Sequence, residues 1–229
     1  MISGIYNLID GSVTQQLRFE TLANNMANSS TNAFKKDILS FNQTLGMQSY
    51  SKTDFSQGPI RYTGNDLDVA LGSDGFLKIQ TANGFRYTRD GALSINTKGF
   101  LVTANGDVVL GKNGPIAVDG GKVSIGQDGE VLVDNAPADT LLVVNFDKPD
   151  LLRKEGGSYY SYQGDNKEIS IKTDSVIKQG YLESSNVNPT QEMVEMIETF
   201  RAFESVQKAI QAIDGLNSKM VNDYGVVSQ

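Results

Sequence analysis

The sequence predicts an α+β fold in which a central, mainly antiparallel β domain is flanked by N- and C-terminal helices. Hydrophobic residues recur every three or four positions over residues 1–28 and again over residues 189–220, which is the spacing of amphipathic helices. Between these stretches, 14 of the 23 glycines lie from Gly58 to Gly129. Glycine turns that separate short hydrophobic runs are typical of antiparallel strands.

The pattern divides the 229-residue chain into four parts, which is enough for one hydrophobic core with peripheral elements. In order, they are an N-terminal helix and motif at 1–35, a linker at 36–57, a β-rich domain at 58–185 and a C-terminal helix at 186–229. Helices at both ends of a β-rich chain favour a protein that associates with copies or relatives of itself.

The first helix has one hydrophobic face, and its glycines weaken it. The face is formed by Ile2, Ile5, Ile9, Val13 and Leu17, and then continues through Phe19, Leu22 and Met26. Gly4 and Gly11 each lower helix propensity by about 1 kcal/mol relative to Ala. Because an isolated helix of this kind is marginal in water, it needs packing partners.

Turn dipeptides mark the reversals of the β domain, since Asx-Gly supplies the positive φ angles of tight turns. They are Asp74-Gly75, Asn83-Gly84, Asp90-Gly91, Asn105-Gly106, Asn113-Gly114, Asp119-Gly120 and Asp128-Gly129. The strands predicted between and after them are Phe76–Gln80, Phe85–Thr88, Phe100–Val102, Val108–Leu110, Val123–Ile125, Val131–Val133 and Leu141–Phe146. The last run is continuously apolar, which favours a strand buried on both faces.

The second helix has a readable start. Asn188 is expected to cap it, Pro189 suits the first helical position, and Gln191 stands where a capping-box side chain reaches back. Its hydrophobic stripe is Met193, Ile197, Phe200, Phe203, Val206, Ile210, Ile213, Leu216 and Met220, with a mean step near 3.5 residues. From pattern alone, the two helices either pair and cap the β domain of a monomer or form a coiled-coil seam with other subunits.

Composition excludes several classes of protein. There is no Cys and no His, which excludes zinc sites made of thiolate and imidazole as well as His-dependent nucleophilic catalysis. The net charge of −7 argues against nucleic-acid binding. No segment approaches the 18 apolar residues of a membrane-spanning helix, and residues 1–16 lack the features of a secretory signal peptide.

Paired carboxylates are the remaining candidates for chemistry. Asp66 with Asp68, or Asp74 with Asp90, could serve a glycosidase or bind calcium. Asp beside Gly is also ordinary turn chemistry, which we favour here. The tyrosines at 159, 160 and 162 fit either a sugar-stacking platform or the rim of a half-buried strand. We therefore predict no catalytic residue, no cofactor and no metal site.

Five ordered motifs resemble the flagellar rod and hook family. They are Ala23-Asn24-Asn25-Met26-Ala27-Asn28 with Ser30-Thr31-Asn32-Ala33-Phe34-Lys35, Gly64-Asn65-Asp66-Leu67-Asp68-Val69-Ala70, Asp74-Gly75-Phe76, Tyr87-Thr88-Arg89-Asp90-Gly91, and Leu182 to Asn188 with Met196-Ile197 and Arg201 to Glu204. Three positions depart from the family pattern. Ala33 replaces a glycine, which makes a positive φ less favourable there, Asp66 replaces a proline and Leu77 replaces a phenylalanine.

The resemblance implies a structural, non-enzymatic subunit of the bacterial flagellar basal-body rod in the periplasm. Its partners would be copies of itself, other rod and axial proteins, and the flagellar type III export apparatus, which would pass it unfolded and without a cleaved signal. The resemblance also implies terminal helices that are largely disordered in the free subunit and order together on assembly as a coiled coil. Such growth uses head-to-tail contacts that do not close.

The residues expected at the assembly interface come from both ends of the chain. They are Ile5, Ile9, Val13, Leu17, Leu22, Asn24, Asn25, Met26, Asn28, Phe34, Asn186, Asn188, Ile197, Phe200, Phe203, Val206, Ile210, Ile213 and Leu216. We expect the amides of Asn24 and Asn25 to satisfy buried backbone or neighbouring-subunit groups, as a polar residue in a seam fixes register. Asn28 could equally be only a helix stop.

Within the family, the proximal-rod type is favoured over the distal type. The chain has no room for the extra domain of the hook type, and residues 37–57 are short compared with the distal type. A different class also stays open, namely a secreted carbohydrate-binding β protein with helical extensions. The absence of Trp argues against it, since sugar sites favour aromatic platforms.

Overall fold

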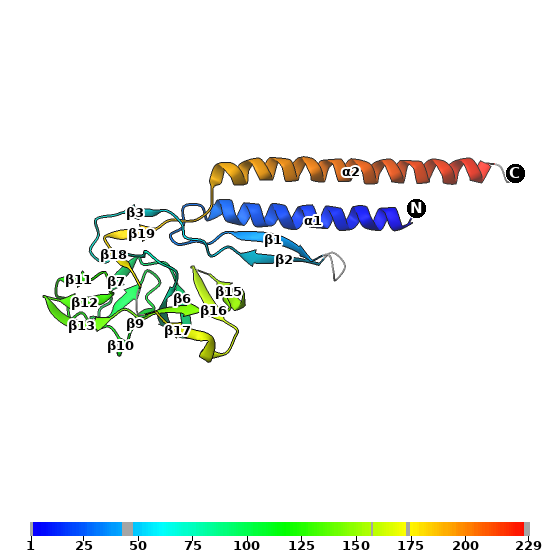
Figure 1. Ribbon diagram of the computed structural model, residues 1–229. Coiled ribbons are helices and arrows are strands. Elements are labelled where there is room, and N and C mark those ends of the chain that lie inside the picture. Colours follow the sequence, from blue (N-terminus) through cyan, green and yellow to red (C-terminus); the bar gives the residue numbers. More distant parts are fainter. Residues whose placement is uncertain (1, 43–47, 157, 173–174, 227–229) are drawn as a thin grey trace. The chain divides into compact units, whose positions relative to one another are not determined.

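The computed structural model describes residues 2–42, 48–156, 158–172 and 175–226 (Figure 1). The chain separates into two compact units. The helical unit contains residues 1–27, 37–52 and 188–229, and the β-rich unit contains residues 28–36 and 53–187. The predicted α+β fold class, with two long helices and a mainly antiparallel β domain, is therefore confirmed.

Two helices and a strand pair make up the helical unit. They are α1 (Ile2–Ala27), α2 (Pro189–Val226), β1 (Asp37–Asn42) and β2 (Gln48–Thr53). In Figure 1, α1 and α2 run side by side, with the N-terminal end of α1 and the C-terminal end of α2 on the same side and α2 extending farther. Their direction is antiparallel, since Ser12 of α1 meets Gln207 of α2 and Arg18 meets Glu195.

The start of α2 follows the prediction in part. Asn188 Oδ1 accepts the backbone N–H groups of Thr190 at 3.2 Å and Gln191 at 3.4 Å, so Asn188 is the cap. The capping-box role predicted for Gln191 is wrong. Its side-chain amide instead donates forward to Glu195 Oε1 at 3.1 Å, since a glutamate one turn ahead offers a stronger acceptor.

Strands β1 and β2 lie within residues 36–57, the segment expected to be a linker. Their sequences, Asp37–Asn42 and Gln48–Thr53, are rich in polar residues and lack a hydrophobic alternation. Strand formation at such sites depends on pairing with a neighbour more than on intrinsic propensity, so the sequence pattern gave little signal.

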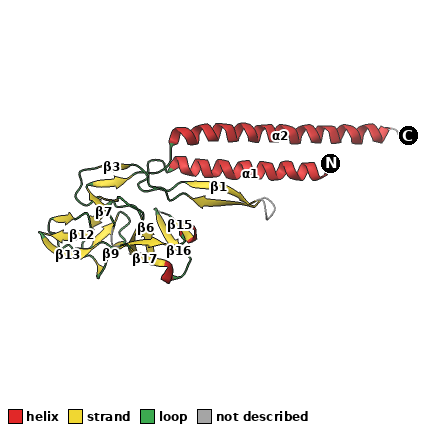
Figure 2. Cartoon of the chain, viewed as in Figure 1, coloured by secondary structure: helices red, strands yellow, loops and turns green. Residues whose placement is uncertain are grey.

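The β-rich unit consists almost entirely of strands joined by turns (Figure 2). Its strands are β3 (Ile60–Tyr62), β4 (Val69–Leu71), β5 (Phe76–Thr81), β6 (Gly84–Thr88), β7 (Leu93–Ile95), β8 (Leu101–Thr103), β9 (Val108–Gly111), β10 (Gly114–Pro115), β11 (Val123–Ile125), β12 (Glu130–Val133), β13 (Ala136–Thr140), β14 (Val143–Phe146), β15 (Leu152–Glu155), β16 (Tyr159–Tyr162), β17 (Ile169–Ile171), β18 (Ile177–Gln179) and β19 (Tyr181–Glu183). Two short 3₁₀ turns, η2 (Pro149–Leu151) and η3 (Asn166–Glu168), interrupt them.

Antiparallel pairing connects these strands into several sheets. The largest has the order β15-β16-β6-β5-β9-β8-β7, with β10 beside β9 and β14 beside both β5 and β17. A second sheet is β11-β12-β13, and the pairs β18-β4 and β19-β3 complete the unit. Strands β18 and β19 bring the end of the β-rich sequence back to its beginning, so residues 60–71 and 177–183 pair across more than a hundred positions.

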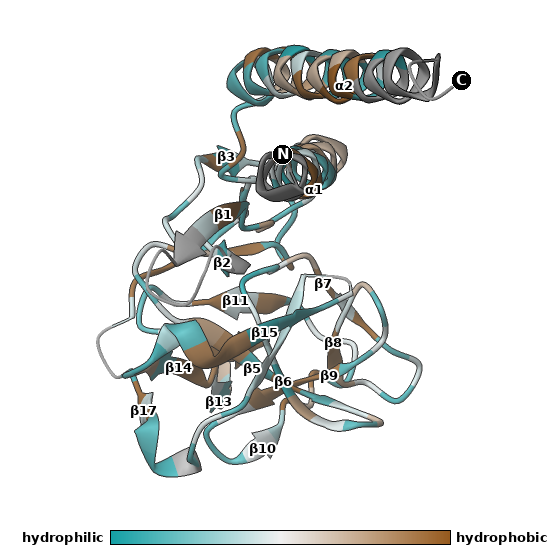
Figure 3. Cartoon of the chain, turned by 90° about the vertical axis from the view of Figure 1, so that its right-hand side faces the viewer, coloured by the Kyte–Doolittle hydropathy of each residue, from teal (hydrophilic) through white to brown (hydrophobic). Residues whose placement is uncertain are grey.

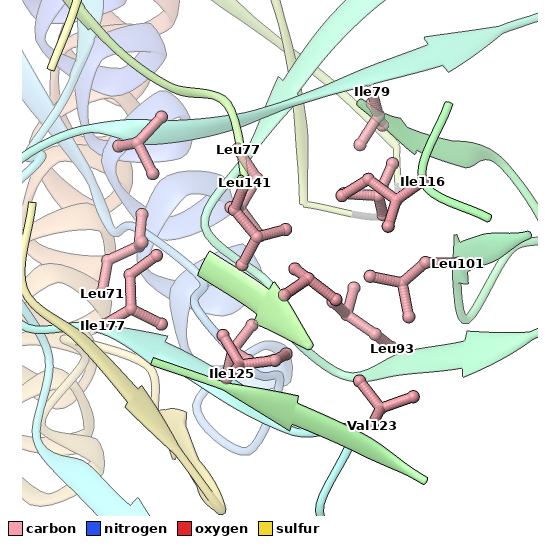
Figure 4. Packing of buried hydrophobic residues seen from close by; sticks show 14 of the residues in the cluster. Leu71, Leu77, Ile79, Leu93, Leu101, Ile116, Val123, Ile125, Leu141 and Ile177 are labelled. Atoms are coloured by element: carbon pink, nitrogen blue, oxygen red, sulfur yellow. The ribbon is translucent and has the colours of Figure 1, made fainter. Parts of the chain in front are cut away.

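Aliphatic side chains from most of these strands form the main core (Figure 4). Leu77, Ile79 and Leu101 converge there, each at most 1% exposed. A second, aromatic cluster packs Phe76, Phe146 and Tyr160 with edge-to-face rings, for example Phe76 and Phe146 at 5.6 Å. Strand β14 contributes to both clusters, so the predicted two-sided burial of this strand is confirmed.

The Asx-Gly turns are confirmed at six of the seven positions. Their glycines have positive φ angles, and they are Gly75, Gly84, Gly106, Gly114, Gly120 and Gly129. Gly91 has no positive φ and is needed for another reason: a Cβ atom there would lie 1.9 Å from the carbonyl oxygen of Val69. The two backbones approach closely because Val69 N–H donates to Gly91 O at 3.0 Å.

The backbone conformation of Ala33 differs from the one expected from the sequence. Its φ is +52°, although an alanine disfavours this conformation. The backbone N–H of Ala33 donates to Glu183 O at 2.8 Å, and the residue is 1% exposed. Tertiary hydrogen bonding and burial therefore hold the left-handed conformation at a cost of about 1–2 kcal/mol.

The Gly91→Ala substitution tests the close approach to Val69. Because the new methyl group would overlap a backbone oxygen, we expect the free energy of unfolding to fall by about 2–3 kcal/mol. Urea denaturation followed by tyrosine fluorescence measures this change. Gly156→Ala is the control, since a Cβ there meets no atom within 4 Å and the expected change is within about 0.5 kcal/mol. Equal effects of the two substitutions would contradict the steric explanation.

Candidate assembly surface

The covered face of α2 contains a seam with heptad spacing and is partly polar. Residues of reduced exposure recur in steps of four and three at Glu192, Met196, Thr199, Phe203, Val206, Ile210 and Ile213, and Glu195, Ala202, Gln207 and Ala209 flank this seam with intermediate exposure. This is the spacing of the a and d positions that face a partner helix in a coiled coil. Glu192 and Thr199 are 6% and 2% exposed, so the first third of the seam buries polar side chains.

A second hydrophobic stripe on α2 is open to solvent. Met193, Ile197 and Phe200 are each more than half exposed, and each stands one position after a seam residue. On α1, Val13 is 50% exposed and Phe19 is 38% exposed. Figure 3 shows hydrophobic and hydrophilic residues alternating along α2. An extended apolar surface of this kind marks an interaction site.

The predicted interface residues of the helices therefore separate into two groups. Leu22 is buried, and Met26, Phe203, Val206, Ile210 and Ile213 are half-buried. Exposed members are Ile9, Val13, Leu17, Ile197, Phe200 and Leu216. The side chain of Ile5 lies outside the described residues.

Asn25 connects three elements of the helical unit. Its Nδ2 donates to Asp37 O at 2.9 Å, while its Oδ1 accepts the N–H of Asp37 at 2.9 Å. The same Nδ2 lies 3.2 Å from Glu192 Oε2, and Asn25 is 2% exposed. One amide thus joins the end of α1, the start of β1 and the first turn of α2, as predicted for a buried polar residue that satisfies backbone groups. Asn24 and Asn188 are exposed.

Asn28, Phe34 and Asn186 belong to the β-rich unit. Asn28 forms a turn in which its carbonyl oxygen accepts the N–H of Thr31 at 3.1 Å, directly after α1 ends at Ala27. Asn186 Oδ1 accepts the N–H of Lys36 at 2.7 Å, and its Nδ2 donates to Asp54 O at 2.9 Å.

Phe34 is buried within the same unit at 8% exposure. The ammonium group of Lys154 lies 4.1 Å from its ring centroid, which is a cation–π contact. The backbone carbonyl of Phe34 also accepts the N–H of Asn186 at 3.2 Å. Residues 28–36 are therefore an integral part of the β-rich unit, together with residues 183–187.

A buried charge network fixes these segments. Glu183 Oε1 accepts from Lys35 Nζ at 2.5 Å, and Glu183 Oε2 accepts from Arg89 Nε at 2.8 Å. The side chains of Lys35 and Glu183 are 0% exposed, and that of Arg89 is 2% exposed. Gly58 N–H also donates to Glu183 Oε1 at 2.9 Å.

Backbone carbonyls complete the network. Lys35 Nζ donates to Ser56 O at 2.6 Å, and Arg89 donates to Gly75 O at 2.7 Å and Ser73 O at 3.3 Å. Burial lowers the pKa of the Lys35 ammonium group, and the adjacent Glu183 carboxylate acts in the opposite direction. A single carboxylate with two cations therefore needs these carbonyl dipoles to offset the remaining positive charge.

Sequence reasoning missed this network, although each of its members lies in a different motif described above. Lys35 ends the N-terminal motif, Arg89 lies in Tyr87-Thr88-Arg89-Asp90-Gly91, and Glu183 lies in the segment Leu182 to Asn188. The available signal was a single charged residue in the first and last of these motifs and the adjacent Arg89 and Asp90 in the other.

One carboxylate of each predicted pair is engaged in a local turn. Asp68 Oδ1 accepts from Asn65 Nδ2 at 3.0 Å, and Asp90 Oδ1 accepts the N–H of Ala92 at 3.1 Å. Burial and the neighbouring Asp68 raise the pKa of Asp90. Within the described residues there is no group of three or more acidic side chains suited to a metal ion.

The tyrosine cluster belongs to the interior of the β-rich unit. Tyr159 and Tyr160 are 8% and 1% exposed, which leaves no open stacking platform at these two rings. Tyr162 donates to Glu168 Oε2 at 2.6 Å, and this hydrogen bond raises the pKa of Tyr162 to about 12. Neither helix, over its described residues, is long and apolar enough to cross a bilayer.

Comparisons with known proteins agree with this architecture. Residues 178–223 match the family described as "Flagellar basal body rod FlgEFG protein C-terminal", and residues 70–133 match "Flagellar hook protein FlgE/F/G D1 domain". The chain is 33% identical over 246 residues to the flagellar basal-body rod protein FlgF of Caulobacter vibrioides, covering 100% of both chains.

Two further relatives come from Bacillus subtilis. The flagellar basal-body rod protein FlgG is 31% identical over 261 residues, with 97% of this chain and 99% of the relative covered. The flagellar hook-basal body complex protein FlhO is 28% identical over 274 residues, with 99% and 100% covered.

The helix pair with its open apolar stripe and the full-length similarity define a protein of the flagellar axial structure. The chain belongs to the flagellar basal-body rod family that includes FlgF and FlgG. It is a structural subunit of the flagellar basal-body rod and not an enzyme, and it assembles with other flagellar rod and hook proteins. The predicted family, structural role and basal-body location are confirmed.

The Glu183→Gln substitution tests the buried network. Removing the carboxylate charge leaves Lys35 and Arg89 buried without a counter-charge, so we expect the free energy of unfolding to fall by about 3–5 kcal/mol. Glu155→Gln is the matched control, because Glu155 pairs with Arg86 at 2.6 Å on the surface. Loss of a surface pair costs about 1 kcal/mol or less. Similar losses in urea denaturation of the two full-length variants would rule out the proposed role of burial.

The Asp90→Asn substitution tests the raised pKa of Asp90. The folded state retains this proton at pH values where the unfolded carboxyl group has already lost it, so the wild-type protein loses stability as pH rises through the folded-state pKa. Asparagine can still accept the Ala92 N–H, so Asp90→Asn should stabilise the protein at neutral pH and have little effect below pH 3.8, the ordinary pKa of the carboxyl group. Denaturant titrations at several pH values measure the difference in the free energy of unfolding between Asp90→Asn and the wild type. This difference would be independent of pH if burial did not raise the pKa of Asp90.

Proposed function

We propose that the chain is a proximal-rod subunit of the FlgF type, forming part of the drive shaft that crosses the periplasm. The observation that carries this proposal is the end-to-end similarity to the FlgF of Caulobacter vibrioides, with 100% of both chains covered. The shortness of the segment at residues 37–57, which contains β1 and β2, supports the same assignment. A distal-rod subunit of the FlgG type is the second candidate, favoured by the 31% identity to the Bacillus subtilis FlgG.

In this proposal, the two terminal helices form the assembly interface. The heptad seam of α2 and the exposed stripe that adjoins it would form coiled-coil contacts when subunits join. Residues 1–27 and 188–226 then form the assembly core, whereas residues 28–187, apart from the β1-β2 pair, form the outer β-rich part. Export through the flagellar type III apparatus as an unfolded chain is compatible with a sequence that has no Cys and hence no disulfide to break.

Immunogold labelling of an epitope-tagged copy on isolated basal bodies tests the function. Label on the membrane-proximal part of the rod is expected, while label near the hook would move the protein to the distal type. Unlabelled rods, in a strain where the tag is shown to be accessible, would contradict both assignments.

The Asn25→Leu substitution tests the amide that joins the helices. It removes the two hydrogen bonds that the Asn25 amide makes with the half-buried backbone of Asp37, worth about 0.5–1.5 kcal/mol each, so incorporation into rods and swimming motility should fall. The tyrosine near-ultraviolet circular dichroism of the β-rich unit should be retained. Gln191→Leu, an exposed amide in the same unit, is the control and should swim normally. Normal motility of Asn25→Leu would count against the role of this amide.

A further inference from the structure

A small cavity in the β-rich unit lies where four segments of that unit meet. Its volume is about 130 Å³. The lining comes from the segment after α1, the β6–β7 connection, the β8–β9 turn and the start of β16, and its residues are Thr31, Asp90, Thr103, Ala104, Asn105, Ser158 and Tyr159. One water molecule takes about 30 Å³, and pockets for larger ligands usually begin at about 300 Å³. The cavity therefore suits the end of a side chain better than a cofactor.

The cavity has polar walls and an edge that is open to solvent. Apart from Ala104, every lining residue carries a hydroxyl, amide or carboxyl group. Thr31 and Asn105 are exposed, whereas Thr103 and Tyr159 are 5% and 8% exposed. The hydroxyl groups of Thr103 and Tyr159 share a hydrogen bond of 2.6 Å. Because an apolar ligand would leave these polar walls without partners, the cavity requires a ligand that forms hydrogen bonds.

Asp90 supplies a carboxylate oxygen that a ligand can reach. The side chain is half-buried, and its Oδ1 accepts the N–H of Ala92 at 3.1 Å. Its Oδ2 accepts no hydrogen bond from the described residues, and it is not one of the polar atoms that are both buried and unpartnered. Oδ2 is therefore in contact with solvent. A charged acceptor of this kind favours a donor of opposite charge.

The lining contains no group that neutralises Asp90. None of the lining residues is Lys or Arg. The guanidinium group of the preceding Arg89 donates to Glu183 Oε2 and to Gly75 O instead. Burial and the neighbouring Asp68 carboxylate raise the pKa of Asp90, because both oppose its negative charge. A cation bound beside Asp90 would offset both carboxylates.

The single free oxygen selects an ammonium group among the cations that proteins carry. A guanidinium group binds a carboxylate best through both oxygens, but Oδ1 of Asp90 is already engaged. An ammonium group is a compact charge with three donors, so it can bond Oδ2 and also the oxygens of Ser158 and Asn105 in the wall. Calcium is disfavoured, since it takes about six to eight oxygen ligands and the lining has one carboxylate.

We propose that this cavity binds the ammonium group of a lysine side chain from an adjacent flagellar subunit. The chain assembles with other flagellar rod and hook proteins, so its exposed surfaces meet the side chains of neighbours. The methylene groups next to the ammonium group would lie beside Ala104, the one apolar residue of the lining. This inference goes beyond the proposed function, because it adds a contact on the β-rich unit to an assembly interface formed by the helices.

Titration of the free, full-length chain with n-butylammonium chloride tests the site, because this cation reproduces the end of a lysine side chain. Tetramethylammonium chloride is the control, since it has the same charge but no N–H donor. The backbone amide NMR signals of Asp90, Ala92 and Asn105 report on the cavity. We expect n-butylammonium to shift these signals along a saturable curve and tetramethylammonium to leave them unchanged. Equal responses to the two cations would reduce the effect to nonspecific charge attraction and overturn the proposal.

The Asp90→Asn substitution removes the charged acceptor. Because the asparagine carbonyl oxygen stays with the Ala92 N–H, its NH₂ group takes the place of Oδ2 and disfavours an ammonium group. The Kd of n-butylammonium should rise at least about tenfold, as for the loss of one hydrogen bond to a charged group. Asp66→Asn is the matched control, with the same change in charge at an exposed residue of the same unit. A rise of the same size in both variants would contradict a specific site at Asp90.

Cross-linking in assembled rods identifies the source of the ammonium group. The chain has no Cys, so Asp90→Cys introduces a unique thiol at the cavity. A short reagent that joins thiols to primary amines is applied to isolated basal bodies, and peptide mapping locates the linked lysine. We expect Asp90→Cys to be linked to a lysine of an adjacent subunit, in clear excess over Asp66→Cys, an exposed control in the same unit.

These outcomes separate the site from its occupant and from the proposed function. If n-butylammonium binds but Asp90→Cys gives no linked lysine above the control, the site takes a free amine, and a neighbouring subunit is rejected as the source. Basal bodies that lack the epitope-tagged protein would remove the proposed function. The titration of the free chain would then still decide whether the cavity binds an ammonium group.

Discussion

The carboxylate of Glu183 holds together three parts of the chain that are far apart in sequence. It binds Lys35, which follows the first helix by eight positions, and Arg89, which lies in the β domain, and its own backbone fixes the left-handed turn at Ala33. An ion pair this deeply buried adds little net stability compared with an apolar core, but the absence of any one member leaves a buried charge without compensation. The network therefore specifies where the chain enters and leaves the β-rich unit.

The subunit contains two units that differ in how completely their side chains are covered. The β-rich unit has its own hydrophobic core, with Leu101, Ile116 and Val118 completely buried, and it pairs the buried charges of Lys35, Arg89 and Glu183 internally. The helical unit instead leaves one hydrophobic stripe of α2 open to solvent beside the covered one. A polymerising subunit requires one unit that is stable by itself and one unit with an apolar surface that neighbouring subunits cover.

The sequence predicted features that depend on local chemistry. Both helices, the Asn188 cap and most Asx-Gly turns follow from spacing and φ preferences, which act within a few residues. At the start of α2 the predicted hydrophobic stripe runs through Ile197 and Phe200, which are exposed in the single chain, whereas the buried side chains are Glu192 and Thr199. Polar residues at buried positions give no hydrophobic signal, so local pattern does not indicate them. The Lys35–Glu183 pair joins residues 148 positions apart and Ala33 takes its φ from a distant carbonyl, so neither could be read from local pattern.

The central claim is that the β-rich unit is stable by itself, whereas the helical unit depends on neighbouring subunits. Hydrogen exchange of the backbone amides in the free, full-length chain tests this claim most directly. We expect amides in β5, β9 and β14 to be protected by the global free energy of unfolding. Amides of α1 and α2 should exchange at least about a hundredfold faster, through local opening worth about 3 kcal/mol less. Uniform protection of helices and strands would contradict the account, because it would make the whole chain one cooperative unit that needs no neighbour.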